Sequence, residues 1–378
     1  MPSRGRTDFR LAQAGVSSCI YILTRRRALI GTKSVLQNRC DCSVPNHPRR
    51  LLPVGLNPLT GFRSKRGRNA PEMEANESVD ATVVITSKDR KEELRVAVES
   101  AVNQTANIEV LVIDDGSSDG TAEMIRSEFP SVRFYRKESS AGLVVRRNQA
   151  AKLARAPILI SIDDDAEFST DHVVEQVLPY FQDDRVGAVG IPFIDVKVDP
   201  DRMSQKAPDA SSLHALFSYI GTAHAIRKDL FLQLGGYRGF FIHQNEEIDF
   251  CIRMLDAGKI VVAGHGDHVI HYKSPKRDNN RYRIYKRRND ILFAWCNVPH
   301  PFLLPHVGGT MVNGAIHAVR DRRLWATAVG MYRGVKDSVL RRGERNPVRP
   351  RIYRLFRTLK KEGMMPVEKI EQFVPTFS

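Results

Sequence analysis

The chain has 378 residues, enough for one large α/β domain with extensions, and it carries a formal net charge of +15. Such a charge is also typical of nucleic-acid-binding proteins, but here it is concentrated at the N-terminus. Residues 1–72 contain 14 Lys and Arg against three acidic residues, a net charge of +11, which leaves only +4 for the remaining 306 residues. The basic character therefore belongs mainly to a leader.

Cysteine use and apolar segments bear on the cellular compartment. The five cysteines form no CxxC pair and show no disulfide or zinc spacing, which fits a reducing compartment. Residues 11–23 are weakly apolar, yet Arg25, Arg26 and Arg27 follow where the cleavage site of a signal peptide should lie. Because no stretch reaches the roughly 18 uninterrupted apolar residues of a spanning helix, we expect a cytoplasmic protein.

The leader is rich in Arg, Ser, Gly, Pro and Asn and shows neither a helical nor a strand period. Such a composition predicts disorder, and we assign residues 1–78 to this basic leader. Ordered composition begins within a few residues of Met73. This suggests that translation starts at Met73, in which case the native protein would lack the leader.

The following segment alternates between apolar runs and helical patterns. Asp89 and Glu92 resemble a capping box at the start of a helix that should run to Gln104. Continuous apolar strands that alternate with amphipathic helices predict an α/β fold, a mostly parallel sheet flanked by helices. Ligands on such sheets bind beyond the carboxyl ends of the strands. The predicted strands are 82–86, 109–114, 132–135 and 156–163.

Beyond these strands the alternation gives way to a loop-rich region, residues 191–222. Helices are predicted again at about 228–234 and 246–257, each followed by glycine, a common C-terminal cap. These limits predict an α/β domain over residues 79–297. A helical, basic extension should follow over residues 298–378.

The start of this extension could touch a membrane. Segment 291–319 has no Asp, Glu, Lys or Arg, but its three prolines and a Gly-Gly pair exclude a continuous spanning helix. Arginines flank it densely on both sides. A basic rim around apolar surface suits peripheral docking on an anionic membrane face. The alternative is a packed C-terminal subdomain with a solvated basic exterior.

Two acidic clusters follow predicted strands. Asp114 and Asp115 open the sequence DDGSSDGT, where adjacent carboxylates can accept hydrogen bonds from a base N–H or a ribose hydroxyl. Turn chemistry alone would also explain these residue types. In the second cluster side chains should alternate, with Asp163 and Asp165 on one side and Asp164 on the other. Two converging carboxylates repel unless a cation separates them, which predicts a hard divalent ion that also binds phosphate.

Two later segments contain further candidates. Residues 243–249 place acids at a helix N-terminus, where the helix dipole favours them, and Asp249 can pair with Arg253. These structural roles explain the acidic residues without any catalytic function. His271 follows a strand in the sequence VIHY, and a lone histidine is more often structural than a ligand.

Together these segments resemble the inverting family 2 glycosyltransferases of GT-A fold, over roughly residues 80–295 and in order. The resemblance implies a Rossmann-like GT-A domain that transfers a sugar from a UDP- or dTDP-type donor to a hydroxyl acceptor. The matching segments are TVVITSKDR (82–90), VLVIDDGSSDGT (110–121), Gly142 to Asn148, ISIDDDAEF (160–168), NEEIDFCIRMLDAG (245–258), VIHY (269–272) and Arg288-Asn289.

The resemblance also implies roles for single residues. Asp163 and Asp165 match the DxD element, with the first near the ribose and the second binding Mg²⁺ or Mn²⁺. His271 matches a histidine near the metal and the diphosphate. Glu247 falls where the family carries its catalytic base, usually Asp, and the longer Glu leaves its neighbour Glu246 as a second candidate. The nucleotide-sugar-binding set is Thr86, Asp89, Asp115, Arg147, Asp163 and Asp164.

The implied partners are a nucleotide-sugar donor and a saccharide or lipid-linked acceptor, in the synthesis of cell-envelope polysaccharide or glycolipid. No nucleic-acid partner is expected, because a pocket of carboxylates repels nucleic acid. The alternatives are a non-catalytic nucleotide-sugar-binding protein and another nucleotide-sugar enzyme. A pyrophosphorylase would need a Gly-rich phosphate loop after the first strand, and TSKDRKEE has no glycine.

Overall fold

The computed structural model describes residues 78–273, 279–320 and 322–375. The chain divides into two compact units, residues 1–71 and 72–378, and every described residue belongs to the second. The predicted leader, apart from Ser78, and the predicted start at Met73 lie outside the described residues.

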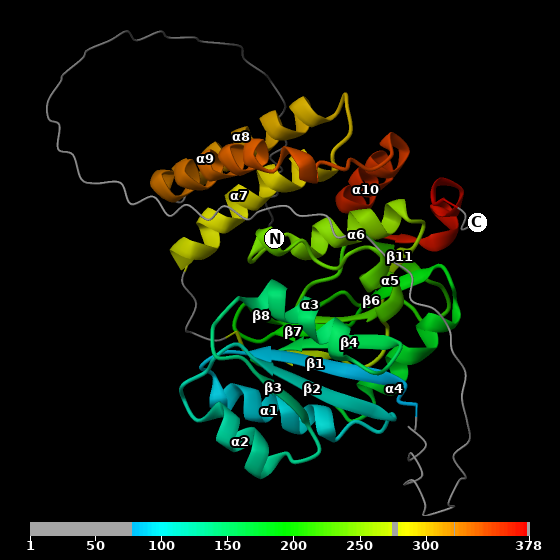
Figure 1. The fold of residues 1–378 in the computed structure, drawn as a ribbon. Helices are drawn as coiled ribbons and strands as arrows, with labels where there is room; N and C mark the ends of the chain where they lie inside the picture. Colours follow the sequence, from blue (N-terminus) through cyan, green and yellow to red (C-terminus); the bar gives the residue numbers. More distant parts are fainter. Residues whose placement is uncertain (1–77, 274–278, 321, 376–378) are drawn as a thin grey trace, which may run out of the picture. The chain divides into compact units, whose positions relative to one another are not determined.

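The described unit is built on a nine-stranded mixed sheet (Figure 1). Across the sheet its strands are β13 (Met364–Pro366), β9 (His214–Leu216), β11 (Ile260–Ala263), β6 (Val186–Gly190), β10 (Ala223–Arg227), β4 (Ile158–Asp163), β1 (Ala81–Ser87), β2 (Ile108–Asp114) and β3 (Arg133–Arg136). Strands β4, β1, β2 and β3 pair in parallel, as predicted for the first half of the domain. Strand β10 then runs antiparallel to both β4 and β6.

Helices pack on both faces of this sheet. Because side chains alternate along a strand, Val83 and Ile85 of β1 point to one face and Val84 to the other. The first face packs against α1 (Lys91–Val102) and α2 (Thr121–Glu128), and the second against α3 (Leu143–Leu153) and α5 (Lys228–Gln233). The remaining helices of this region are α4 (Val173–Val177) and α6 (Glu246–Asp256). The predicted helix-flanked α/β fold is confirmed.

The prediction of a loop-rich region at 191–222 is wrong in part, because this region contributes two strands to a second, four-stranded sheet. Its order is β5 (Ala166–Phe168), β12 (Val269–His271), β7 (Phe193–Asp195) and β8 (Asp199–Ser204). Strands β7, β8 and β9 all lie in the segment predicted to be loop-rich. They are only three to six residues long. Strand β8 pairs with the adjacent β7, whereas β7 and β9 are also held by distant partners, β12 and β11. Strands this short leave no clear local sequence period.

The C-terminal region is helical, as predicted for residues 298–378. Its helices are α8 (Leu303–Arg320), α9 (Leu324–Leu340) and α10 (Pro350–Glu362), and α7 (Asn279–Asn297) precedes them. Short 3₁₀ turns occupy Leu178–Gln182, Gly239–Phe241, Arg342–Glu344, Val367–Lys369 and Glu371–Phe373. None of the helices in the described ranges combines the length and apolar character needed to cross a membrane.

The predicted capping box at Asp89 is wrong. Helix α1 starts at Lys91 and ends at Val102, and its N-terminal residue has no side-chain cap. Asp89 adopts a positive φ of 52° and accepts a hydrogen bond from the backbone N–H of Ser118, at 2.8 Å. The carboxylate is therefore used by the turn that follows β2, a partner far away in the sequence.

Candidate active site

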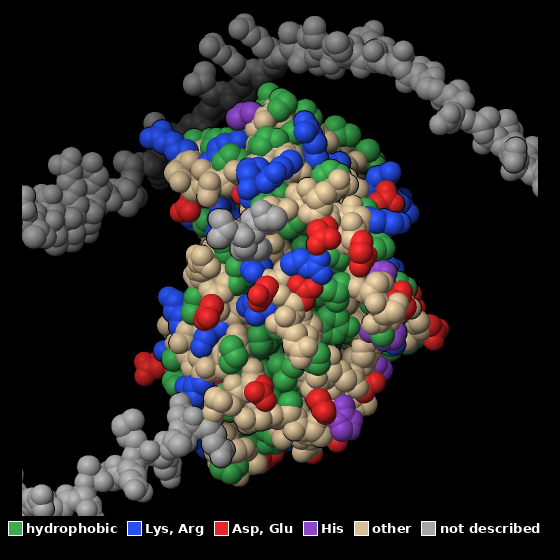
Figure 2. All heavy atoms as spheres, turned by 90° about the vertical axis from the view of Figure 1, so that its right-hand side faces the viewer, with side chains coloured by type: hydrophobic (Ala, Val, Ile, Leu, Met, Phe, Trp, Pro, Cys, Tyr) green, Lys and Arg blue, Asp and Glu red, His purple; other side chains and the backbone are tan. Residues whose placement is uncertain are grey.

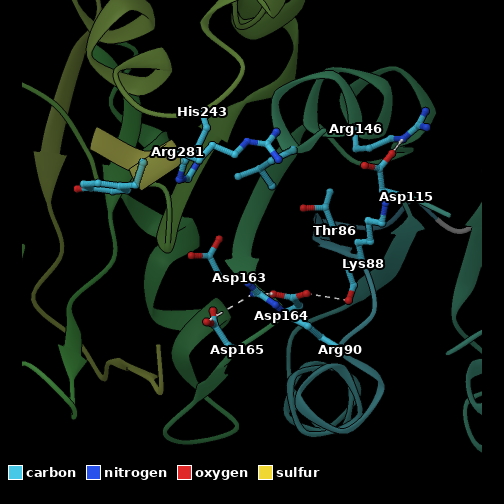
Figure 3. A pocket seen from close by; sticks show the side chains of 13 residues that line it. Thr86, Lys88, Arg90, Asp115, Arg146, Asp163, Asp164, Asp165, His243 and Arg281 are labelled. Carbon is cyan, nitrogen blue, oxygen red and sulfur yellow. Dashed lines mark hydrogen bonds and ion pairs between the residues drawn. The ribbon is translucent and has the colours of Figure 1, made fainter. Parts of the chain in front are cut away.

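The polar clusters meet at one edge of the sheet. Strands β1, β2 and β4 are parallel and in register, with Thr86 opposite Asp163 and Ser87 opposite Asp114. Their carboxyl ends therefore lie side by side, and a cavity of 360 Å³ opens beyond them (Figure 3). It is lined by Thr86, Ser87, Lys88, Arg90, Asp115, Leu143, Arg146, Asp163, Asp164, Asp165, His243, Arg281 and Tyr282.

Asp163, Asp165 and His271 converge at the side of this cavity. One ligand atom from each lies within 4.8 Å of the other two. Asp165 and His271 are almost fully buried, and Asp165 Oδ1 lies 3.3 Å from His271 Nε2. Two carboxylates and an imidazole at this spacing fit a divalent cation such as Mn²⁺, with positions left for phosphate oxygens.

Asp164 lines the same cavity but is not part of the group formed by Asp163, Asp165 and His271. Its carboxylate accepts hydrogen bonds from the Ser87 hydroxyl and from Arg90 Nη1, each at 2.7 Å (Figure 3). Burial raises the pKa of Asp164 to about 6, although Arg90 and Ser87 stabilise the ionised form. This residue ties the end of β1 to the turn that follows β4.

Sequence reasoning missed Asp195. It ends β7, and the parallel pairing with β12 places it opposite His271. Asp195 Oδ2 lies 3.4 Å from His271 Nδ1, while Asp165 faces the other ring nitrogen. A carboxylate at the second nitrogen is the usual support for a metal-binding histidine. No local signal identifies Asp195, because its position depends on the pairing of two distant strands.

The Asp115 carboxylate is fully engaged by donors of the protein itself. Oδ1 accepts from Arg146 Nε at 2.5 Å and from the Ala141 N–H at 2.8 Å. Oδ2 accepts from the Ser140 hydroxyl at 2.6 Å and from the Gly142 N–H at 2.9 Å. Burial raises the pKa of Asp115, but these hydrogen bonds outweigh it and hold the pKa below its usual value. Arg146, which the sequence reasoning missed, lines the cavity at this end.

Arg147, the arginine predicted to lie near the nucleotide, is not part of the cavity lining. Its Nη2 donates to Asp163 Oδ1 and to the Gly221 carbonyl, each at 2.8 Å. Its Nη1 lies 3.7 Å from Glu247 Oε1. A single buried guanidinium thus connects the candidate metal ligand Asp163 with the candidate base Glu247.

Glu246 and Glu247 begin α6 in different surroundings. Glu246 is 1% exposed, and its Oε2 atom has no hydrogen-bond partner. The Glu247 side chain is 17% exposed and faces Arg147. Burial raises the pKa of Glu246 to about 8, with the adjacent Glu247 charge acting in the same direction. Burial also raises the pKa of Glu247, while Arg147 opposes the shift. Glu247 is therefore the more accessible carboxylate of the two.

The asparagine of the matching Arg-Asn pair, Asn289, orients α6. Its side-chain amide donates to the carbonyls of Phe241, His243 and Gln244 at 2.7, 2.8 and 2.7 Å. Gln244 and Asn245 both have positive φ, 77° and 69°, a conformation that costs free energy in residues other than glycine. Asn289 thus stabilises the strained loop from which α6 presents its two glutamates.

The other predicted nucleotide-binding residues divide between the cavity and its surroundings. Thr86 lines the cavity, whereas Asp89 is outside the lining and joins the turns after β1 and β2. Arg281 and Tyr282 of α7 line the cavity together with His243, and Figure 3 shows Arg281 and His243 across from the aspartates. His243 belongs to the candidate segment 243–249, but sequence reasoning assigned it no role of its own. Arg281 and Tyr282 were missed, and the basic character of segment 281–288 was their available signal.

Comparisons with known proteins identify glycosyltransferases as similar proteins. The family model described as glycosyl transferase family 2 matches residues 82–247. An uncharacterized glycosyltransferase of Haemophilus influenzae is 24% identical over 46% of this chain and 61% of its own length. Another, from Bacillus subtilis, is 33% identical over 29% of each chain. The chain thus spans less than two thirds of these relatives.

A solved structure shares the fold. The crystal structure of GalNAc-T7 with UDP, GalNAc and Mn²⁺ matches with a TM-score of 0.50 at 17% identity. The match covers 60% of this chain and 49% of that chain. Similarity at this level concerns the arrangement of helices and strands.

Proposed function

Through residues 82–247 the chain belongs to glycosyl transferase family 2, and from this premise we propose that it transfers a sugar from a nucleoside diphosphate donor to a hydroxyl acceptor. The donor is of the UDP or dTDP type, and transfer inverts the anomeric centre. The reaction depends on Mn²⁺ or Mg²⁺.

The convergence of Asp163, Asp165 and His271 beside the cavity carries this proposal. A volume of 360 Å³ is in the range of small-molecule sites. A divalent cation held by these three side chains would neutralise the charge that accumulates on the departing diphosphate. The presence of UDP and Mn²⁺ in the GalNAc-T7 structure supports the same assignment.

We assign the nucleotide-sugar donor to the cavity, with its diphosphate next to Asp163, Asp165 and His271. Thr86 and Asp163 face the ribose, and the cationic group of Arg281 faces the phosphates. Asp115, held by Arg146, recognises the base, which requires one of its four present donors, such as the Ser140 hydroxyl, to be exchanged for the base N–H. Asp164 lines the cavity and fixes the end of β1, while Asp89 lies outside the lining and joins the turns after β1 and β2.

Glu247 is the proposed general base. The acceptor oxygen forms a bond to C1 of the sugar, the bond from C1 to the diphosphate oxygen breaks, and the hydroxyl proton passes to Glu247. General-base catalysis of this kind contributes about 10²–10⁴-fold to the rate. Arg147 holds the Glu247 carboxylate in place, and Glu246 lies behind it. A single displacement on one face of the sugar accounts for inversion.

The proposal extends to the acceptor and the cellular setting. We assign the enzyme to cell-envelope polysaccharide or glycolipid synthesis at the cytoplasmic face of the membrane, with a lipid-linked acceptor. Exposed apolar side chains of α8 and α9, described below, support peripheral membrane contact through the C-terminal region.

The proposal is tested by thermal unfolding of the full chain with UDP, dTDP and GDP, each with Mn²⁺, Mg²⁺ or EDTA. We expect UDP or dTDP to raise the melting temperature only with a divalent cation. The Asp165→Asn variant, which keeps the shape of the side chain but removes its charge, should lose this effect. Stabilisation by every nucleotide to the same extent in EDTA would contradict the proposal.

A further inference from the structure

A second cavity, of 270 Å³, lies between α7, α8 and α9. Four of its lining residues are cationic, and none of the residues that line it is acidic. Asp290 is shared by Lys286, at 3.7 Å, and Arg287, at 3.3 Å. Cationic groups gathered around one cavity repel one another, and a bound anion relieves this repulsion. The cavity is lined by Tyr282, Arg283, Lys286, Arg287, His317, Ala318, Arg323 and Thr327.

This cationic cavity adjoins the donor cavity. Tyr282 lines both of them. Asp290, which Lys286 contacts, also accepts a hydrogen bond from the side-chain amide of Asn245, at 2.8 Å. Asn245 directly precedes the two glutamates that begin α6, so an anion bound beside Lys286 would place the molecule that carries it near the start of this helix.

The outer face of α8 and α9 is apolar. Residues 303–319 contain no Asp, Glu, Lys or Arg, yet much of α8 is exposed, with Leu304 at 77%. Trp325 of α9 is 80% exposed. Figure 2 shows apolar and basic side chains together at the upper end of the drawn face, where these helices lie. The exposed large apolar residues are Leu304, Val312, Ile316 and Val319 of α8 and Leu324, Trp325, Tyr332, Val335, Val339 and Leu340 of α9.

Exposed apolar surface of this kind marks an interface, and its charged surroundings indicate which one. The basic residues Arg320, Arg322, Arg323 and Arg333 are exposed beside the apolar side chains. Apolar side chains with a basic rim match an anionic membrane surface, where apolar burial and electrostatic attraction act together. A soluble phosphate compound would use the cationic cavity but would leave the apolar face of α8 and α9 in water.

On the basis of the proposed transferase function, we propose that the acceptor is a membrane lipid bearing a phosphate group. Its phosphate binds in the cavity formed by Arg283, Lys286, Arg287 and Arg323. The apolar face of α8 and α9 lies in the lipid surface. The acceptor hydroxyl then reaches Glu247 past Tyr282, which separates the two cavities.

The test uses the full chain and Trp325 as an internal probe. Vesicles of phosphatidylcholine alone are compared with vesicles that also contain phosphatidic acid, a phosphate monoester, or phosphatidylglycerol, a diester, at equal fraction. We expect a blue shift of the emission and quenching by brominated lipid with phosphatidic acid, both lost in Trp325→Phe. The basic leader can bind vesicles by itself, but it would leave the emission of Trp325 unchanged.

Two matched variants distinguish phosphate binding in the cavity from general electrostatic attraction to the membrane. Lys286→Gln/Arg323→Gln and Arg320→Gln/Arg322→Gln each remove two positive charges at the same end of the unit, but only the first pair lines the cavity. The wild type should prefer phosphatidic acid over phosphatidylglycerol by about fivefold, the effect of about one additional charge. The Arg320/Arg322 variant should keep this preference, and the Lys286/Arg323 variant should lose it.

Three results would overturn the inference. The first is a Trp325 emission that stays unchanged with every vesicle. The second is an equal loss, in both variants, of the preference for phosphatidic acid over phosphatidylglycerol. The third is binding of inorganic phosphate that depends on Lys286 and Arg323 in a protein that binds no vesicle. Stabilisation by UDP and Mn²⁺ is measured on the same variants and should be unchanged. Its absence in the wild type would reject the transferase function itself, whatever the vesicles show.

Discussion

Two carboxylate clusters meet at Arg147 and differ in how they are stabilised. In the aspartate cluster each member has a polar partner, with Arg147 at Asp163, Arg90 at Asp164 and His271 at Asp165. The glutamate pair at the start of α6 is buried with less support, and Glu246 Oε2 has no hydrogen-bond partner. The two clusters are therefore prepared for different chemistry.

The two environments favour two different roles, binding of a cation and acceptance of a proton. Two aspartates whose oxygens converge with a histidine nitrogen can bind a cation, as proposed for Asp163, Asp165 and His271. A buried glutamate with a raised pKa holds a proton more tightly than an exposed one, which makes it a better proton acceptor near neutral pH. The first cluster thus suits the leaving diphosphate and the second the incoming hydroxyl.

The largest effect is expected from loss of a metal ligand. Asp165→Ala should reduce transfer by roughly 10³-fold or more, because a cation at a leaving group contributes several kcal/mol. Metal-dependent stabilisation by UDP should disappear, while the melting temperature without ligand should change little. Asp184→Ala, at a side chain that is 97% exposed, is the matched control. An active Asp165→Ala protein would remove the aspartate cluster from catalysis.

Glu247→Gln should have the next largest effect. The amide cannot accept the proton, so the rate of transfer should fall by about 10²–10⁴-fold. Binding of UDP with Mn²⁺ should be unchanged, since this substitution leaves Asp163 and Asp165 in place. Single-turnover rates and UDP affinity, measured on the same preparation, separate these effects. Full activity of Glu247→Gln would exclude it as the base.

Asp195→Asn should weaken the support of the metal site without removing a ligand. Loss of a carboxylate beside a metal-binding histidine typically lowers metal affinity or activity by about 10–100-fold. Titration with Mn²⁺ in the presence of UDP measures the shift, and excess Mn²⁺ should restore most of the rate. A rate that stays low at saturating Mn²⁺ would show that Asp195 acts in another way.

The smallest effect concerns pH. Since burial raises the pKa of both glutamates, transfer should increase with pH as the pair loses its proton, well above the ordinary range of glutamate. Glu246→Gln removes a neighbouring negative charge and should move this rise to lower pH with little loss of the maximal rate. The profile of rate against pH decides, and a rise moved to higher pH would contradict the assignment.

Much of the fold could be predicted because its first half is locally encoded. The apolar runs of β1, β2 and β4 are long enough to identify strands, and Asp163 and Asp165, expected to lie on one side, do converge. The assigned roles of these residues, and the domain limits at residues 79 and 297, stay predictions.

The rest depends on partners that are distant in the sequence. The short strands β7 and β9 pair with later segments, β12 and β11, and therefore Asp195 lies in a region predicted from the sequence to be a loop. Which of Arg146 and Arg147 faces the cavity depends on how α3 packs on the sheet. The spacing of Asp89 and Glu92 predicts a helix cap. The actual partner of Asp89, the backbone N–H of Ser118, is 29 residues away and leaves no signal in the local sequence.

The central claim is that Asp163, Asp165 and His271 hold a divalent cation against a diphosphate. Anomalous diffraction at the manganese edge, from crystals of the full chain grown with UDP and Mn²⁺, tests it most directly. The account predicts one strong peak between these three side chains, in contact with oxygens of the diphosphate. UDP bound in the cavity with no manganese peak at that corner would contradict it.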